Sequence, residues 1–160
     1  MKKLKVMTIL GTRPEIIRLS EVIKACDKYF DHVLVHTGQN YDPRLNDIFF
    51  EELGLKQPDY YLECPGNTLG ETMGNILART YEVMLADQPD AVLIMGDTNS
   101  ALSAICAKRL KTPIFHMEAG NRCWDWNVSE MINRKVVDAI SDINLPYTEN
   151  SRRYLLSEGV

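Results

Sequence analysis

The sequence has few of the features that mark metal-binding, redox-active and disulfide-bonded proteins. Its four cysteines include no C-x-x-C pair, and its three histidines lack the spacing of metal ligands. Neither a zinc cage nor a redox-active dithiol is indicated, so we expect no metal. Reduced thiols in a cytoplasm fit this composition best. The cysteines are Cys26, Cys64, Cys106 and Cys123.

Positive charge and long apolar runs are also scarce. The 18 lysines and arginines stand against 22 aspartates and glutamates, a net charge of −4, so we expect no nucleic-acid partner, although a local anion pocket remains open. No stretch reaches the ~20 apolar residues of a membrane helix. The N-terminal run Val6–Leu10 is too short for a signal peptide. We therefore expect no membrane insertion and a cytoplasmic location.

The common nucleotide and hydrolase motifs are missing. Gly11 does not begin a G-x-G-x-x-G, and no G-x-x-x-x-G-K-[ST] occurs in the chain. A dinucleotide fingerprint and a P-loop are thus excluded. Ser100 and Ser129 lack the surrounding elbow motif, which argues against a serine hydrolase.

The chain does have a regular alternation of short apolar runs and longer amphipathic segments. Its 160 residues, 45% of them hydrophobic, suffice for one core, and we predict one domain over residues 1–160. The alternation predicts an α/β fold, with a parallel sheet and helices on both faces. The predicted strands are Leu4–Leu10, His32–His36, Asp59–Leu62, Ala91–Met95, Pro113–Met117 and Asp142–Pro146; the predicted helices are Pro14–Lys28, Leu45–Leu53, Thr68–Ala86, Ser100–Leu110, Glu130–Ile140 and Thr148–Ser157.

Polar clusters follow four of the predicted strands. In an open parallel sheet the carboxyl ends of the strands meet at one edge, where ligands bind. We therefore expect Arg13, Asp97 and Glu118 to converge there. The clusters are Gly11-Thr12-Arg13, His36-Thr37-Gly38-Gln39, Gly96-Asp97-Thr98 and Glu118-Ala119-Gly120.

Some of these residues also have a purely structural explanation. The segment from Gly11 to Pro14 can be a capped turn, and Asp97 can cap the helix that follows it. Glu118 favours function, because a carboxylate at the end of an apolar strand is costly unless it is paired or used.

Two further residue types lie near the predicted edge. His116 is predicted to be a hydrogen-bonded core histidine, because it lies inside an apolar strand. Trp124 and Trp126 either stack on a ligand or a neighbouring domain, or pack beneath their loop.

Five motifs occur in a fixed order along the chain. They are Gly11-Thr12-Arg13-Pro14-Glu15, Thr37-Gly38-Gln39, Gly96-Asp97-Thr98, His116-Met117-Glu118-Ala119-Gly120, and Glu130 followed by Asn133-Arg134. Together they resemble the non-hydrolysing UDP-N-acetylglucosamine 2-epimerase family over essentially the whole chain.

The resemblance implies the N-terminal half of a GT-B fold, one of two Rossmann-like halves that close on a UDP-sugar. The C-terminal UDP-binding domain is then absent from this chain. The implied reaction inverts C2 of a UDP-N-acetylhexosamine by elimination and re-addition of UDP, without a cofactor, in the synthesis of cell-surface polysaccharide precursors. The implied partners are the UDP-sugar and either further copies of the chain or the missing domain.

The resemblance also assigns roles to particular residues, position by position. Arg13, Asp97, Glu118 and Glu130 correspond to catalytic residues, with Arg13 near the departing diphosphate. The implied substrate-binding residues are Gly11, Thr12, Gln39, Thr98, Asn121, Arg122 and Arg134.

The strings Thr37–Asp42 and Glu118–Cys123 are most similar to the capsule and O-antigen branch of the family, which makes UDP-N-acetyl-L-fucosamine. Ser129 and Met131 stand where the family has proline and a second glutamate. Asp42 replaces a glutamine linked to the activator site of the UDP-N-acetylglucosamine branch. Two alternatives stay open: a non-catalytic half-enzyme that binds or assembles with partners, and the N-terminal half of a GT-B glycosyltransferase.

Overall fold

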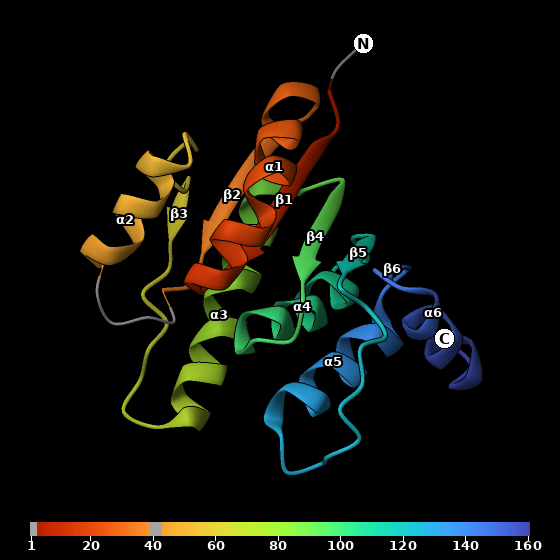
Figure 1. Cartoon of the computed structure of the whole chain (residues 1–160). Helices are drawn as coiled ribbons and strands as arrows, with labels where there is room; N and C mark the ends of the chain where they lie inside the picture. Colours follow the sequence, from red (N-terminus) through yellow and green to blue (C-terminus); the bar gives the residue numbers. More distant parts are fainter. Residues whose placement is uncertain (1–2, 39–42) are drawn as a thin grey trace.

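Six strands form one sheet in the computed structural model, which describes residues 3–38 and 43–160 (Figure 1). Every neighbouring pair is parallel, and the strand order is β3-β2-β1-β4-β5-β6. This is the order of a Rossmann fold, as predicted. The strands are β1 Lys5–Leu10, β2 Asp31–His36, β3 Tyr60–Tyr61, β4 Ala91–Met95, β5 Ile114–Met117 and β6 Ile143–Leu145.

The helices match the predicted segments to within a few residues at most ends. They are α1 Arg13–Tyr29, α2 Pro43–Glu52, α3 Leu69–Asp87, α4 Ala104–Arg109, α5 Ser129–Ile140 and α6 Glu149–Ser157, with a 3₁₀ helix, η1, at Asn99–Ser103. Within the described residues, no helix is both long enough and apolar enough to cross a membrane.

The predicted helix Ser100–Leu110 differs from the structure in its first turn, which is the 3₁₀ helix η1. The Ser103 hydroxyl donates to the carbonyl of Ser100 at 2.7 Å, and the Ser100 hydroxyl lies 2.7 Å from that of Thr37. Serine side chains that bond to nearby backbone compete with the α-helical ladder. The tighter turn follows from these buried bonds.

The core lies on both faces of the sheet, because alternate strand residues point to opposite sides. On one face, residues such as Met7, Ile9 and Ile94 pack with α3 and α4. On the other, Leu10, Leu34 and Met95 form a cluster with residues of α1 and α2. The prediction of helices on both faces is thus confirmed.

The order in which strands are added to the sheet reverses between β1 and β4. From β1 the sheet grows one way through β2 and β3, and the other way through β4, β5 and β6. In doubly wound sheets ligands bind outside the carboxyl ends of the strands at such a switch point. In this chain that place is where the loops at Gly11 and Gly96 begin.

Candidate functional site

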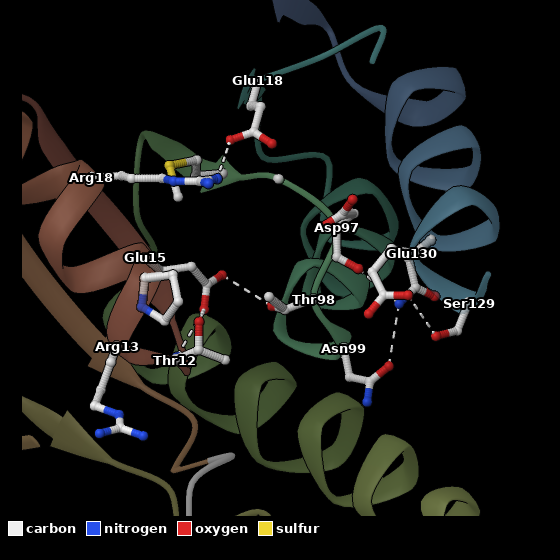
Figure 2. A pocket seen from close by; sticks show the side chains of 14 residues that line it. Thr12, Arg13, Glu15, Arg18, Asp97, Thr98, Asn99, Glu118, Ser129 and Glu130 are labelled. Carbon is white, nitrogen blue, oxygen red and sulfur yellow. Dashed lines mark hydrogen bonds and ion pairs between the residues drawn. The ribbon is translucent and has the colours of Figure 1, made fainter. Parts of the chain in front are cut away.

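A cavity of about 450 Å³ opens at the switch point of the sheet (Figure 2). Three parts of the chain line it: the start of α1, the loop after β4, and the end of β5 with the start of α5. The lining residues are Thr12, Arg13, Pro14, Glu15, Arg18, Met95, Gly96, Asp97, Thr98, Asn99, Glu118, Ser129, Glu130 and Asn133. The structure therefore brings together all four residues predicted to be catalytic.

One side of the cavity, which we call the β1–α1 wall, consists of Gly11–Arg18 and is organised around Glu15. The Glu15 Oε2 accepts from the backbone N–H groups of Gly11 and Thr12, at 3.0 and 2.8 Å, and from the Thr12 hydroxyl at 2.8 Å. Its Oε1 accepts from the Thr98 hydroxyl at 3.0 Å. Burial raises the pKa of Glu15, although these four bonds act in the opposite direction.

Glu15 was not predicted as a site residue, although it lies in the first motif. The available signal was the spacing Thr12-x-x-Glu15, which is that of a capping box at the start of a helix. The bond to Thr98 adds a second role, because it joins this wall to the loop after β4. The turn Gly11–Pro14 is capped, but the acceptor of its first two backbone N–H groups is Glu15 and not Thr12 or Arg13, and the same turn lines the cavity.

Gly11 lies where no side chain fits. A Cβ at this position would come within 2.1 Å of the hydroxyl oxygens of both Ser100 and Thr37. The chain therefore needs glycine here for the end of β1 to pass against η1. Gln39, the predicted binding residue nearest to Thr37 in sequence, lies outside the described residues.

Two arginines of α1 lie at the cavity. Arg13 is exposed, and in Figure 2 its side chain extends away from the acidic groups on the opposite side. Arg18 donates from Nη1 to Glu118 Oε2 at 2.8 Å, although its side chain is 57% exposed. Arg18 was not predicted; the signal was its position three residues after Glu15, which gives both the same helix face.

The opposite side, which we call the β4–β5–α5 wall, is held by Arg134. Its Nε donates to Asp97 Oδ2 at 3.1 Å, its Nη2 donates to Asp97 Oδ2 and, at 3.1 Å, to Glu118 Oε1, and its Nη1 donates to the Glu118 carbonyl. Arg134 is buried. The two carboxylates of the wall therefore share one buried cation.

Asp97 and Glu118 are placed by their backbones as well as by Arg134. The residue that caps η1 is Thr98, so the Asp97 carboxylate is directed to Arg134 instead of capping the helix. Glu118 has a φ of 62°, in the left-handed region that side chains disfavour. Strain of this kind is concentrated at functional sites. The sequence prediction that Glu118 must be paired or used agrees with both observations.

Helix α5 presents four polar residues to the site: Ser129, Glu130, Asn133 and Arg134. Glu130 is exposed, lines the cavity and accepts from the Ser129 hydroxyl at 3.0 Å. Asn133 donates from Nδ2 to the Asp97 carbonyl at 3.0 Å and to Asn99 Oδ1 at 3.2 Å. Glu130, Asn133 and Arg134 share a face because residues three and four apart are neighbours on a helix.

Asn121 and Arg122 do not line the main cavity. Asn121 accepts from the Ser151 hydroxyl at 2.7 Å, and the buried side chain of Arg122 pairs with Asp138 at 2.7 Å and Glu158 at 2.6 Å. Both residues border a second cavity of about 220 Å³, which also touches Asp97, Glu130 and Arg134. Arg122 is thus committed to a network of ion pairs behind the site.

The tryptophans and His116 take different positions. Trp124 and Trp126 are 59% and 62% exposed, so the suggestion that they pack beneath their loop is wrong. Trp124 makes an edge-to-face contact with Tyr154, and Lys135 lies over the Trp126 ring. His116 is a core histidine, as predicted, with Nε2 donating to the Gly96 carbonyl at 2.8 Å. Among the described residues, no group of His, Cys, Asp and Glu side chains could hold a metal ion.

Several known proteins are similar to this chain. The family model described as UDP-N-acetylglucosamine 2-epimerase matches residues 24–160. The chain is 43% identical to the UDP-N-acetylglucosamine 2-epimerase of Methanocaldococcus jannaschii, covering 98% of the chain and 43% of that protein. It is 41% identical to the UDP-2,3-diacetamido-2,3-dideoxy-D-glucuronate 2-epimerase of Pseudomonas aeruginosa, covering 98% and 45%. The chain therefore spans less than half the length of these relatives.

Solved structures give the same result. The structure of UDP-N-acetylglucosamine 2-epimerase from Rickettsia bellii matches with a TM-score of 0.93 and 56% identity, over 99% of this chain and 42% of that one. MurG of Acinetobacter baumannii, at 13% identity and a TM-score of 0.69 over 92% and 42%, shares the fold alone. The site motifs, the family model and these relatives agree: the chain belongs to the UDP-N-acetylglucosamine 2-epimerase family.

Proposed function

We propose that this chain supplies the N-terminal half of the active site of a UDP-N-acetylhexosamine 2-epimerase. The observation that carries the proposal is the placement of Asp97, Glu118 and Glu130 around one cavity at the switch point of the sheet. Inversion at C2 requires a weakly acidic proton to be removed from one face of the sugar and returned to the other. Carboxylates held in different surroundings suit this work.

The three carboxylates have different surroundings, which supports a division of labour. Asp97 and Glu118 share the buried Arg134, whereas Glu130 is exposed and bonded to Ser129. Arg134 and Arg18 hold Glu118 from two sides. We propose that Asp97 and Glu118, which Arg134 holds in fixed positions, act on the sugar, and that the exposed Glu130 contacts it from the solvent side of the cavity.

The β1–α1 wall suits the diphosphate of the substrate. The N-terminus of a helix attracts anions through its N–H groups and its dipole. Arg13 lies in the first turn of the 17-residue helix α1, with its side chain exposed at the cavity. We propose that Arg13 binds the departing UDP. A structure of the M. jannaschii relative, matching with a TM-score of 0.93 at 43% identity over 98% of this chain and 44% of that one, is in complex with UDP-N-acetylglucosamine and UDP.

The proposal includes a second domain. The relatives are more than twice as long as this chain. We propose that a second Rossmann-like domain closes over the UDP-sugar, and that the 160-residue chain alone does not turn over substrate. The cytoplasmic location, expected from the reduced cysteines, stays a prediction.

The test is exchange of the C2 hydrogen of UDP-N-acetylhexosamines in heavy water. We would replace the matching N-terminal part of the R. bellii protein with this chain and compare the chimera with the chain alone. We expect the chimera to incorporate deuterium at C2 and the chain alone to incorporate none. Asp97→Asn and Glu118→Gln should each reduce exchange at least about 100-fold. A folded chimera without exchange would overturn the proposal.

The same assay addresses the substrate. The resemblance to the L-fucosamine branch rests on Thr37–Asp42 and Glu118–Cys123, and the named relatives act on other UDP-sugars. We propose a substrate of the L-fucosamine series and would test it against UDP-N-acetylglucosamine in the chimera. Faster exchange with UDP-N-acetylglucosamine would contradict this choice.

A second candidate function is a binding or assembly module. Trp124 and Trp126 expose large apolar side chains, which supports contact with another chain. Native mass spectrometry of the chain, alone and mixed with a full-length relative, tests this candidate. A chain that stays monomeric and does not bind the relative would exclude this function.

A further inference from the structure

A buried network of charged side chains lies behind the β4–β5–α5 wall. Its centre is Asp138, which is fully buried on α5. Asp138 accepts from the backbone N–H of Gly120 at 3.2 and 3.3 Å and from Arg122 Nη1 at 2.7 Å. Arg122 in turn donates to Glu158, which also pairs with Lys135. The network thus fixes the loop that follows Glu118.

His116 joins this network to the other catalytic loop. Its Nε2 donates to the carbonyl of Gly96, the residue before Asp97. Its Nδ1 lies 2.9 Å from Asp138 Oδ1, at ion-pair distance, without a well-aligned hydrogen bond. Both side chains are buried. A carbonyl can only accept, so the Nε2 must carry a proton.

The position of Nδ1 requires a second proton. A neutral imidazole with its proton on Nε2 would leave an unprotonated nitrogen 2.9 Å from a carboxylate oxygen in a site without solvent, which is unfavourable. Protonating Asp138 instead would weaken its bonds from Arg122 and Gly120.

We propose that Asp138 holds His116 as a doubly protonated imidazolium, and that this pair positions the loops that carry Asp97 and Glu118. The role of those two carboxylates rests on the proposed function; the proton on His116 does not. The groups that face the His116 ring are Asp138 from α5, the Gly96 carbonyl beyond β4 and, through Asp138, Arg122.

The test uses the 160-residue chain labelled with ¹⁵N-histidine. His36 is an internal reference, because its Nδ1 accepts from the Gly38 N–H and is therefore unprotonated. At pH 7 we expect protons on both ring nitrogens of His116 and on only one of His36. An unprotonated His116 Nδ1 would overturn the proposal, and the wild-type chain alone gives this answer.

Two matched variants test the positioning role. Asp138→Asn should convert His116 to the neutral form with a proton on Nε2, and should shift the backbone resonances of Gly96 and Gly120. Asp142→Asn is the control, since Asp142 is an exposed partner of Lys108 outside the network. In the chimera, Asp138→Asn should lower kcat about 100-fold with little change in KM, and Asp142→Asn should not.

The proposed function and the proposed role of His116 can be contradicted independently of each other. A wild-type chimera without C2 exchange would contradict the proposed function but leave the ¹⁵N result to decide the state of His116. An Asp138→Asn variant that leaves His116 doubly protonated, or leaves the Gly96 and Gly120 resonances in place, would contradict the positioning role.

Discussion

The two walls of the cavity are built in different ways. In the β1–α1 wall, Glu15 bonds to Gly11 and Thr12, four and three residues away. In the β4–β5–α5 wall, Arg134 bonds to Asp97 and Glu118, 37 and 16 residues away. In the first wall neutral donors satisfy the carboxylate, three of them from the same turn and one from Thr98, whereas the second wall is an assembly of charges that only the sheet brings together. The two walls should therefore respond differently to substitution.

The largest loss of stability is expected from a substitution in the β4–β5–α5 wall. Arg134→Met would leave two mostly buried carboxylates without their shared cation, and breaking a buried pair in this way costs about 3–5 kcal/mol. Urea unfolding measures the loss. Arg152→Met is the control, because Arg152 pairs with Glu149 on an exposed face of α6 and its loss should change stability little. An Arg134→Met variant as stable as this control would contradict the claim that the β4–β5–α5 wall depends on its buried cation.

A smaller loss of stability is expected from a substitution in the β1–α1 wall. Gly11→Ala places a Cβ against the hydroxyls of Ser100 and Thr37, and overpacking of this kind costs about 1–3 kcal/mol. Gly74→Ala is the control: Gly74 lies within α3 with open space around its Cβ position, and helix propensity predicts a gain of about 0.5–1 kcal/mol. Thermal unfolding of both variants gives the sign of each effect.

Glu15 in the β1–α1 wall should also make the stability of the chain depend on pH. Burial raises the pKa of Glu15 above its ordinary value of 4.5, so the folded chain holds this proton more tightly than the unfolded chain. The contribution of Glu15 to stability is then fully present below pH 4.5 and is lost as the pH rises through the raised pKa. Glu15→Gln should flatten this part of the stability profile. An unchanged profile from unfolding curves at several pH values would contradict the assignment.

The smallest effect is expected for Arg18. It pairs with Glu118 as Arg134 does, but its side chain is 57% exposed, so Arg18→Met should cost about 0–1 kcal/mol. Arg134 is buried and bonds to both carboxylates, whereas Arg18 is exposed and makes one bond to Glu118, so the two losses should differ. A loss equal to that of Arg134→Met would show that the Arg18 pair is shielded from solvent.

Much of this structure could be predicted from the sequence. The alternation of apolar runs gave the parallel sheet, because a strand covered on both faces needs a continuous apolar stretch, as in Ala91–Met95. The polar clusters after the strands gave Arg13, Asp97 and Glu118, since strand ends meet at one edge. The first turn after Thr98 was not predicted, because its 3₁₀ form depends on contacts between Ser100 and Thr37.

Other parts of the site depend on residues far apart in sequence. Arg18 gave no signal of its pairing with Glu118, which is 100 residues away. The role of Arg122 is similar: its motif places it next to the site, yet its guanidinium turns to Asp138 and Glu158. A motif identifies the residues of a loop but not the direction of each side chain.

The sequence by itself determined the fold class and the edge of the sheet that bears the site. These follow from periodicity and turn chemistry, which act over a few residues. The tertiary structure alone decided which polar side chains are brought together and buried: Arg134 between Asp97 and Glu118, and His116 against Asp138. Electrostatic interactions depend on distance and exposure to water, and both are set only when separate strands and helices pack together.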